Sequence, residues 1–332
     1  MLTVNPAPLY PINETINYFI KTDKAAIKSG NLSHLLKSVS TISNNYSKDV
    51  TSNSCEARTF NASASLLAGG KLKNILAGGH LILDQGNIDL RIYPGKITYV
   101  KDEPVKDSDV YRRMTFFTDT RQKKHCCLYP APPSQQAAPA KEITLNSRQN
   151  NFIKPLDCCN IEGFWRKSRD IHHLVPRLEA SGYTLLSALK MLPCDLARQV
   201  ATSAVGDVLK KCHAESTELM IFVGNEAVVQ IHSGKIDKIV QLGKQRRNVI
   251  HSTTRDGNRA IFKYNIDDVA QVWAVNKMSQ DGVIKSLDIF DKEGNVIFQF
   301  FGLREEGKKQ PITWINMLDS LQPVIIHLPL ND

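Results

Sequence analysis

The sequence predicts an α+β fold made of two tandem structural repeats, each with helices packed on a large, mostly antiparallel β-sheet. In the second half, segments with helical periodicity come before a long run of strand patterns, without the strand–helix–strand alternation of a parallel sheet. Similar strand pairs recur about half a chain apart, as a duplication would give.

A stretch rich in proline, alanine and glutamine near the middle of the chain predicts the boundary between the halves. From Pro130 to Pro139 it has no apolar periodicity, which is typical of a linker. We therefore expect an N-terminal repeat over 1–129, a linker over 130–150 and a C-terminal repeat over 151–332. The first fifty residues are rich in Ser, Asn and Thr, and only 16–36 has modest helical character.

Alternating apolar residues predict the strands. In the first half, strands are expected over 97–100 and 114–119, and their counterparts in the second half over 272–275 and 287–291. Strand patterns dominate from 219 to 301. Two helices are expected ahead of them, one over 185–192 and one from Leu196 through Val205 to Leu209, because apolar residues recur there at helical spacing.

Composition excludes several classes of protein. The chain is 42% hydrophobic and 23% charged, and no apolar run is long enough to insert into a membrane. The first ten residues lack the basic-then-apolar order of a secretory signal. Seven cysteines form no CxxC pair, and two adjacent couples, Cys126-Cys127 and Cys158-Cys159, indicate reduced thiols. A cytoplasmic protein is expected.

The formal net charge of +9 indicates either a solvated basic surface or an attraction for anions such as nucleic acid, acidic partners or a dianionic ligand. The basic runs are short, as in 244–247 and 308–309, so nucleic-acid binding is only a minor alternative. The sequence has no nucleophile elbow, P-loop, HExxH or GxGxxG motif, which excludes the common hydrolase and nucleotide-binding classes.

An ordered series of motifs covers about half the chain. It begins with Asp170-Ile171-His172-His173 and continues with the segments at 220–225 (MIFVGN), 272–277 (VWAVNK), 286–291 (SLDIFD) and 299–304 (QFFGLR). In this order and spacing the chain resembles the HemS-type hemin-degrading factors, bacterial cytoplasmic proteins that bind and move heme and in some members cleave it. The resemblance implies two structural repeats with heme in the cleft between them, and a role in heme utilisation for iron acquisition.

The resemblance implies that His172, on the family's Asp-x-His position, is the proximal ligand of the heme iron. Its neighbour His173 is the alternative ligand. Asp170 is placed either to cap a helix or to orient an imidazole. Pro176 cannot donate a helical hydrogen bond to the carbonyl of His172, so a helix here is either kinked or begins later.

Further contacts follow from the same resemblance. It implies that Arg91, within 88–93, reaches the distal side of the heme, where its five donors would hydrogen-bond a ligand; the alternative is a strand arginine facing solvent. Lys277, Gln299 and Arg304 match heme-contacting positions, and Phe301 matches an aromatic position that packs on the porphyrin. Each of these, taken alone, also fits a solvated strand residue.

Three other residues complete the set of candidates. Leu185 stands where many relatives carry arginine, so one partner for a heme propionate would be missing. His125 and His232 lie in strand patterns, and we interpret them as core or surface histidines rather than as a second heme site.

The resemblance leaves two functions open. The protein either degrades heme with electrons from an external donor, since no flavin or Rossmann fingerprint is present, or carries heme to a separate heme oxygenase. The expected partners are heme, a heme importer or heme oxygenase, and an electron donor, and the protein is expected to be a monomer or homodimer.

Overall fold

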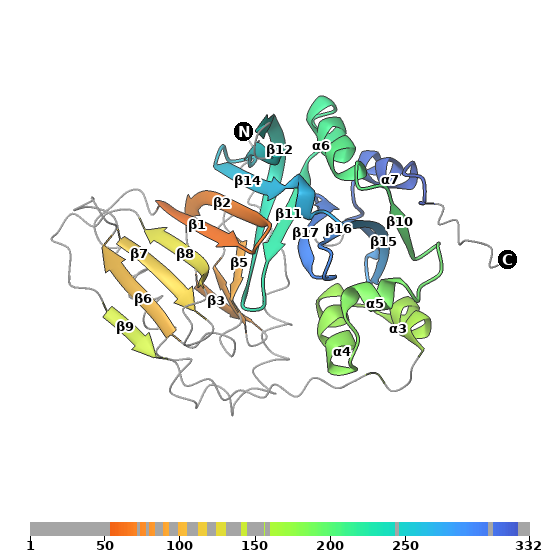
Figure 1. Cartoon of the computed structure of the whole chain (residues 1–332), viewed down its shortest axis with the longest axis horizontal. Coiled ribbons are helices and arrows are strands. Elements are labelled where there is room, and N and C mark those ends of the chain that lie inside the picture. Colours follow the sequence, from red (N-terminus) through yellow and green to blue (C-terminus); the bar gives the residue numbers. More distant parts are fainter. Residues whose placement is uncertain are drawn as a thin grey trace. The chain divides into compact units, whose positions relative to one another are not determined.

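The computed structural model describes residues 54–71, 74–77, 80–83, 89–92, 99–104, 112–117, 124–130, 141–144, 156, 160–242, 246–304 and 308–324. The chain forms two compact units (Figure 1). The first unit comprises Met1–Asn151 and Phe222–Tyr264, and the second comprises Phe152–Ile221 and Asn265–Asp332. The expected helix over 16–36 lies outside the described residues.

The first unit is built from antiparallel strands. They are β1 (Ser54–Phe60), β2 (Ala64–Lys71), β3 (Asn74–Ala77), β4 (His80–Leu83), β5 (Asp89–Ile92), β6 (Tyr99–Pro104), β7 (Arg112–Phe117), β8 (Lys124–Pro130), β9 (Lys141–Thr144), β12 (Val228–Leu242), β13 (Arg247–Thr253) and β14 (Arg259–Asn265). The units do not divide at the linker, because β12 pairs with β5 and β14 pairs with β2.

One ladder of the first unit runs from β9 through β6, β7, β8, β1 and β2 to β14. It continues through the turn at Thr254–Asn258 to β13, which pairs with β12. Thr59, Leu66, Ile250 and Phe262 are fully buried on one face of this ladder, so the residues that alternate with them form the opposite, outer face.

The second unit begins with helices. Its elements are α3 (Ile161–Lys167), the 3₁₀ turn η2 (Ile171–His173), α4 (Leu174–Ala180), α5 (Leu185–Leu189), β10 (Ala197–Val200), α6 (Ala204–Ala214), η4 (Ile266–Asp268), β15 (Gln271–Ser279), β16 (Gly282–Phe290), β17 (Val296–Gly302) and α7 (Ile312–Asp319). Strand β11 (Leu219–Gly224) crosses the boundary between the units. β10, β15, β16 and β17 pair antiparallel in that order.

Helices α3, α4 and α5 cover one face of this sheet. Asn160 and Thr184 cap α3 and α5 by accepting hydrogen bonds from the backbone N–H groups of Gly163 and Ser187. Their apolar residues form one core with Trp273 and Val275 of β15. Trp165 is fully buried in this core and donates from Nε1 to the carbonyl of Asn276 at 2.7 Å, which ties α3 to the sheet.

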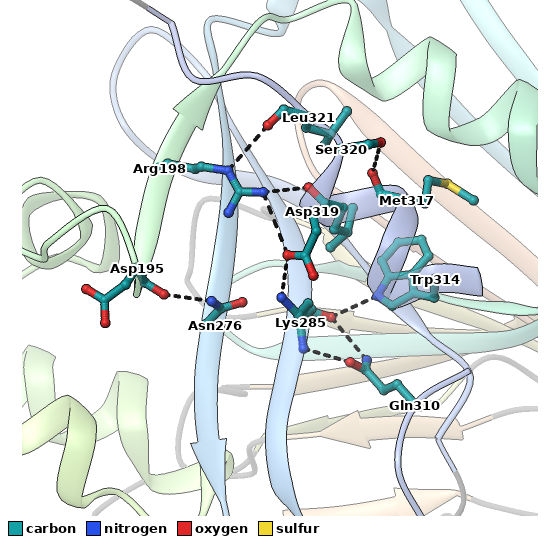
Figure 2. Close-up of polar contacts among 11 residues, drawn as sticks. Asp195, Arg198, Asn276, Lys285, Gln310, Trp314, Met317, Asp319, Ser320 and Leu321 are labelled. Atoms are coloured by element: carbon teal, nitrogen blue, oxygen red, sulfur yellow. Dashed lines mark hydrogen bonds and ion pairs between the residues drawn. The ribbon is translucent and has the colours of Figure 1, made fainter. Parts of the chain in front are cut away.

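Helix α7 packs on the opposite face. Trp314 lies over Gly302 and donates from Nε1 to the carbonyl of Lys285 at 3.0 Å. Figure 2 shows how polar groups fix the end of this helix: Arg198 of β10 donates to the carbonyls of Leu318 and Leu321, at 2.6 and 3.4 Å. Lys285 of β16 forms an ion pair with Asp319.

The α+β class, the strands from 219 to 301 and the helix over 185–192 are confirmed, although α5 ends at Leu189. The prediction of a helix beginning at Leu196 is wrong, because Ala197–Val200 form strand β10 against β15, and the helix begins only at Ala204. Backbone pairing with β15 outweighs a weak helical periodicity there. Within the described residues, no helix is long and apolar enough to cross a membrane.

The tight contact between Gly302 and Trp314 gives a testable expectation. A Cβ at position 302 would lie 2.5 Å from Trp314 Cγ, so Gly302→Ala should lower the free energy of unfolding by about 1–3 kcal/mol. Gly206→Ala is the matched control: nothing lies within 4 Å of its Cβ, and it sits in helix α6, where alanine is favoured by about 0.5–1 kcal/mol. Denaturant unfolding of both variants measures this, and equal changes of the same sign would contradict it.

Candidate functional site

His172 lies in the 3₁₀ turn that leads into α4. Asp170 caps this turn: its Oδ1 accepts a hydrogen bond from the backbone N–H of His172 at 2.9 Å. The same oxygen lies 2.7 Å from the ring Nδ1 of His172. Both roles expected for Asp170, capping and orienting an imidazole, are therefore present in one residue. Helix α4 begins after His172, at Leu174, so Pro176 lies in its first turn, where a missing N–H is tolerated.

The carboxylate of Asp170 fixes the chemistry of the His172 ring. Burial raises the pKa of Asp170, but hydrogen bonds from the ring and backbone of His172, together with the charges of His172 and His173, outweigh burial and bring it to about 2. The ionised carboxylate only accepts, so the ring proton sits on Nδ1 and the lone pair of the neutral imidazole lies on Nε2. The side chain of His172 is 38% exposed.

His173 is bound to the same carboxylate in a different way. Its Nε2 lies 3.5 Å from Asp170 Oδ2, and its side chain is 57% exposed. His173 thus faces Asp170 with Nε2, whereas His172 faces it with Nδ1. Of the two imidazoles, that of His172 lies closer to the Asp170 carboxylate, at 2.7 Å against 3.5 Å.

Three other candidates lie together on one sheet face. Strand register places Lys277 of β15 and Phe301 and Gln299 of β17 on the face that also carries Trp273 and Val275. This is the face covered by α3 to α5. The Lys277 ammonium lies 4.7 Å from the centre of the Phe301 ring.

Lys277 is buried and carries its own counter-ion. Its Nζ donates to both oxygens of Asp288 on β16, at 3.1 and 2.9 Å, and the Asp288 side chain is fully buried. Gln299 stands opposite Asp288 in the register of β16 and β17. The sequence pattern included Asp288 within 286–291 but gave no sign that it would neutralise Lys277.

The hairpin between β15 and β16 brings Arg304 and the histidine turn to one place. Arg304, just after β17, forms an ion pair with Asp281 in this hairpin. Gln280, the residue before Asp281, donates from its backbone N–H to the carbonyl of Arg169 at 3.0 Å. Because Arg169 precedes Asp170 directly, the hairpin contacts both the cation and the segment that carries His172.

Two guanidinium nitrogens in this unit are buried without a hydrogen-bond partner among the residues that the structure describes: Nε of Arg304 and Nε of Arg177. Arg177 lies on α4, one turn beyond His172, with its guanidinium 4.9 Å from the centre of the Phe164 ring. Arg177 was not among the site residues predicted from the sequence. Leu185, in contrast, is buried in the helical core and offers no polar group.

Arg91 belongs to the first unit. It lies on β5 opposite Val229 of β12 and forms an ion pair with Asp89 at 3.2 Å; the two side chains are 15% and 12% exposed. It is therefore not the solvent-facing strand arginine of the alternative reading. Within the described part of the chain, no group of three or more His, Cys, Asp or Glu residues could hold a metal ion by itself.

Comparison with known proteins identifies the domain that carries most of these residues. The model of the haemin-degrading HemS.ChuX domain matches residues 183–321, which contain Lys277, Gln299, Phe301 and Arg304. His172 lies just before the matched region.

Two curated relatives match by sequence. The hemin transport protein HemS of Yersinia enterocolitica is 27% identical over 263 residues, which are 74% of this chain and 73% of the relative. The hemin transport protein HmuS of Yersinia pestis is 29% identical over 177 residues, which are 53% of this chain and 49% of the relative. The chain thus matches only about half the length of HmuS. Neither relative supports the nucleic-acid alternative.

Two solved structures share the fold. The structure of ChuS, described as an E. coli heme oxygenase, superposes with a TM-score of 0.68 at 23% identity, covering 82% of this chain and 84% of that chain. Apo-PhuS, described as a heme-binding protein from Pseudomonas aeruginosa, gives a TM-score of 0.67 at 20% identity over 82% of each chain. The domain match and the two curated relatives agree with one another: residues 183–321 match the HemS.ChuX domain, and the chain is similar to hemin transport proteins.

Proposed function

We propose that this protein binds heme for heme utilisation and iron acquisition, with His172 as the axial ligand of the iron. The observation that carries the proposal is the 2.7 Å bond between Nδ1 of His172 and Asp170, which directs the lone pair of the ring to Nε2. A carboxylate behind a ligating histidine is the usual arrangement in metal sites. The names of the two curated relatives, both hemin transport proteins, support heme as the molecule that is bound.

The residues around His172 fit a heme in their chemistry. Heme needs an imidazole donor, apolar or aromatic walls and cations for two propionates. The second unit offers the His172 ring, the Phe301 ring and the guanidinium group of Arg177, whose Nε is buried without a partner in the described residues. Arg304 also has a buried Nε without such a partner, but its guanidinium group already forms an ion pair with Asp281. Arg177 would supply the cation that Leu185 does not.

Each residue would have a separate task. Asp170 holds the His172 ring in one orientation and one tautomer. Lys277 is neutralised by Asp288, so it would act by holding Phe301 through the cation–π contact rather than as a free charge at the rim. Gln299 would donate hydrogen bonds from its amide, and Arg91 would supply guanidinium donors on the distal side. When bound, heme supplies the redox chemistry.

A hemin titration followed by absorbance tests the proposal. The wild type should give a saturable Soret shift, and His172→Ala should lose or strongly alter it. His173→Ala is the matched control, because it removes an imidazole held by the same carboxylate, and it should keep the wild-type spectrum. If His173→Ala loses the shift while His172→Ala keeps it, the ligand is assigned to the wrong residue. No saturable shift in the wild type would reject heme binding.

Asp170→Asn separates orientation of the ligand from ligation itself. The amide no longer draws the ring proton of His172 to Nδ1, so hemin affinity should fall by about 10- to 100-fold while the Soret band of the saturated protein keeps its position. Asp195→Asn is a control on an exposed carboxylate of the same unit, paired with Arg166, and should leave affinity unchanged. An unchanged affinity in Asp170→Asn would show that the carboxylate only caps the turn.

We propose that the protein acts in the cytoplasm, where it either degrades the bound heme or passes it on. A reductant assay separates the two. Loss of the Soret band with release of iron, resistant to catalase, would establish degradation. Loss that catalase abolishes would mean damage by peroxide, and transfer to an added heme oxygenase without loss would establish a carrier.

We also propose that the chain arose from two related halves, 1–129 and 151–332, joined by a linker at 130–150 that includes strand β9. Recurrence of strand pairs half a chain apart supports this. Expression of 151–332 alone tests the boundary: a folded fragment would support it. An unfolded one would indicate that Phe222–Tyr264 requires the strands of the first unit.

A further inference from the structure

The segment that returns to the first unit carries much of the positive charge of the protein. Residues 222–264 contain eight Lys or Arg against three Asp or Glu, in a chain whose net charge is +9. Because these residues form β12, β13 and β14, the charge lies on a sheet rather than on a tail.

Register places the cations on one face of this sheet. Lys238 stands opposite His251, and Lys235 opposite Thr253, across β12 and β13. On β14, Ile261 stands opposite Leu67 of β2, which in turn stands opposite Arg58 of β1. The hydrogen bond from Asn248 to the hydroxyl of buried Tyr264 fixes the inward face of β13 and β14. We call the outward set the basic face: Arg58, Lys235, Lys238, Arg247, Arg259 and Lys263.

The basic face is accessible and poorly neutralised. All its members but Lys263, which is half-buried, are exposed. None of the six forms an ion pair within the part of the chain that the structure describes. The carboxylates nearby include Asp237, whose Oδ2 accepts from the hydroxyl of Thr253, and Asp256 in the turn between β13 and β14. Register also places Glu56, two positions before Arg58 on β1, on this face. Strand and residue spacings give the face a size of about 20 Å by 20 Å.

We propose that the basic face is a docking surface for an acidic protein. The size matches a small, transient interface, which buries less than about 600 Å² on each partner. The face is made of sheet strands, and in the part of the chain that the structure describes it carries no helix that would enter a nucleic-acid groove. Its apolar members are Leu67, Val240, Leu242, Val249 and Ile261. Of these only Leu242, opposite Arg247, is exposed, so a single apolar side chain is available to insert into a lipid surface. The proposal does not rest on heme binding.

Binding of fluorescent poly-L-glutamate to the whole chain tests the proposal. The patch variant combines Lys238→Gln, Arg247→Gln and Arg259→Gln, all at exposed positions. The control variant combines Lys190→Gln, Lys210→Gln and Lys309→Gln, which removes the same charge from exposed positions of the second unit. The patch variant should lose about tenfold in affinity and have a smaller salt dependence. The control should change by less than about twofold.

Three outcomes would overturn the proposal. Equal losses in the two variants would mean that only net charge matters, and no binding by the wild type would mean that the face holds no acidic chain. Duplex DNA or phosphatidylglycerol vesicles that bind more tightly than poly-L-glutamate, with the same dependence on the patch, would assign the face to nucleic acid or membrane. Equal thermal unfolding of both variants and the wild type shows that all are folded.

Discussion

Lys277→Met should lower the free energy of unfolding by about 3–5 kcal/mol, because it leaves the fully buried carboxylate of Asp288 without its only cation in the described structure. Methionine keeps the length of the side chain, so the loss reports the uncompensated charge rather than a cavity. Denaturant unfolding at neutral pH measures the change.

The double variant Lys277→Met with Asp288→Leu should recover most of that loss. Replacing a buried ion pair by apolar residues of similar volume is often neutral or stabilising, since neither charge must then be removed from water. A double variant as unstable as Lys277→Met would instead mean that packing around Phe301, and not the unpaired charge, causes the loss.

Lys285→Met is the matched control on the other face of the same sheet. Its partner Asp319 is 48% exposed at the end of α7, so water can solvate the carboxylate once the lysine is gone. The expected cost is below about 1 kcal/mol. A loss as large as that of Lys277→Met would contradict the distinction between the buried and the exposed pair.

Local patterns predicted most of the fold and only part of the site. Alternation of apolar residues depends on one strand at a time, so β15, β16 and β17 could be found from sequence. Strand β10 could not, because its four residues are held by pairing with β15, more than 70 positions away. The same limit applies to the return of β12 and β14 to the first unit, which local periodicity does not encode.

The candidate site shows the same division between local and distant contacts. The spacing Asp-x-His was enough to suggest that Asp170 orients His172, since both residues lie in one turn. The neutralisation of Lys277 by Asp288 and the contact of Gln280 with Arg169 depend on how β15 and β16 pair and how their hairpin meets the turn. The resemblance therefore suggested a heme-contacting cation at 277, where the fold places a buried ion pair.

His232 should make the stability of the protein fall in mild acid. Its Nε2 donates to Ser252, whose hydroxyl donates in turn to the carbonyl of Lys235. The Nδ1 atom is therefore an acceptor, and it is buried with no partner among the described residues. A proton on Nδ1 would place a charge and a donor in the core, and burial lowers the pKa of His232 to about 4, against a weak opposing effect of Asp237.

The sign of the effect follows from linkage. The unfolded chain binds a proton at this residue below pH 6.5, while the folded protein does so only near pH 4, so protons favour unfolding between these values. The expected loss is about 3 kcal/mol between neutral pH and pH 4. His232→Gln cannot bind this proton. The free energy of unfolding of the variant should therefore fall less than that of the wild type over the same pH range, by about 3 kcal/mol. His213→Gln on the exposed side of α6 controls for the removal of an imidazole. If the free energies of unfolding of the wild type and His232→Gln run parallel with pH, water reaches Nδ1 in the folded protein.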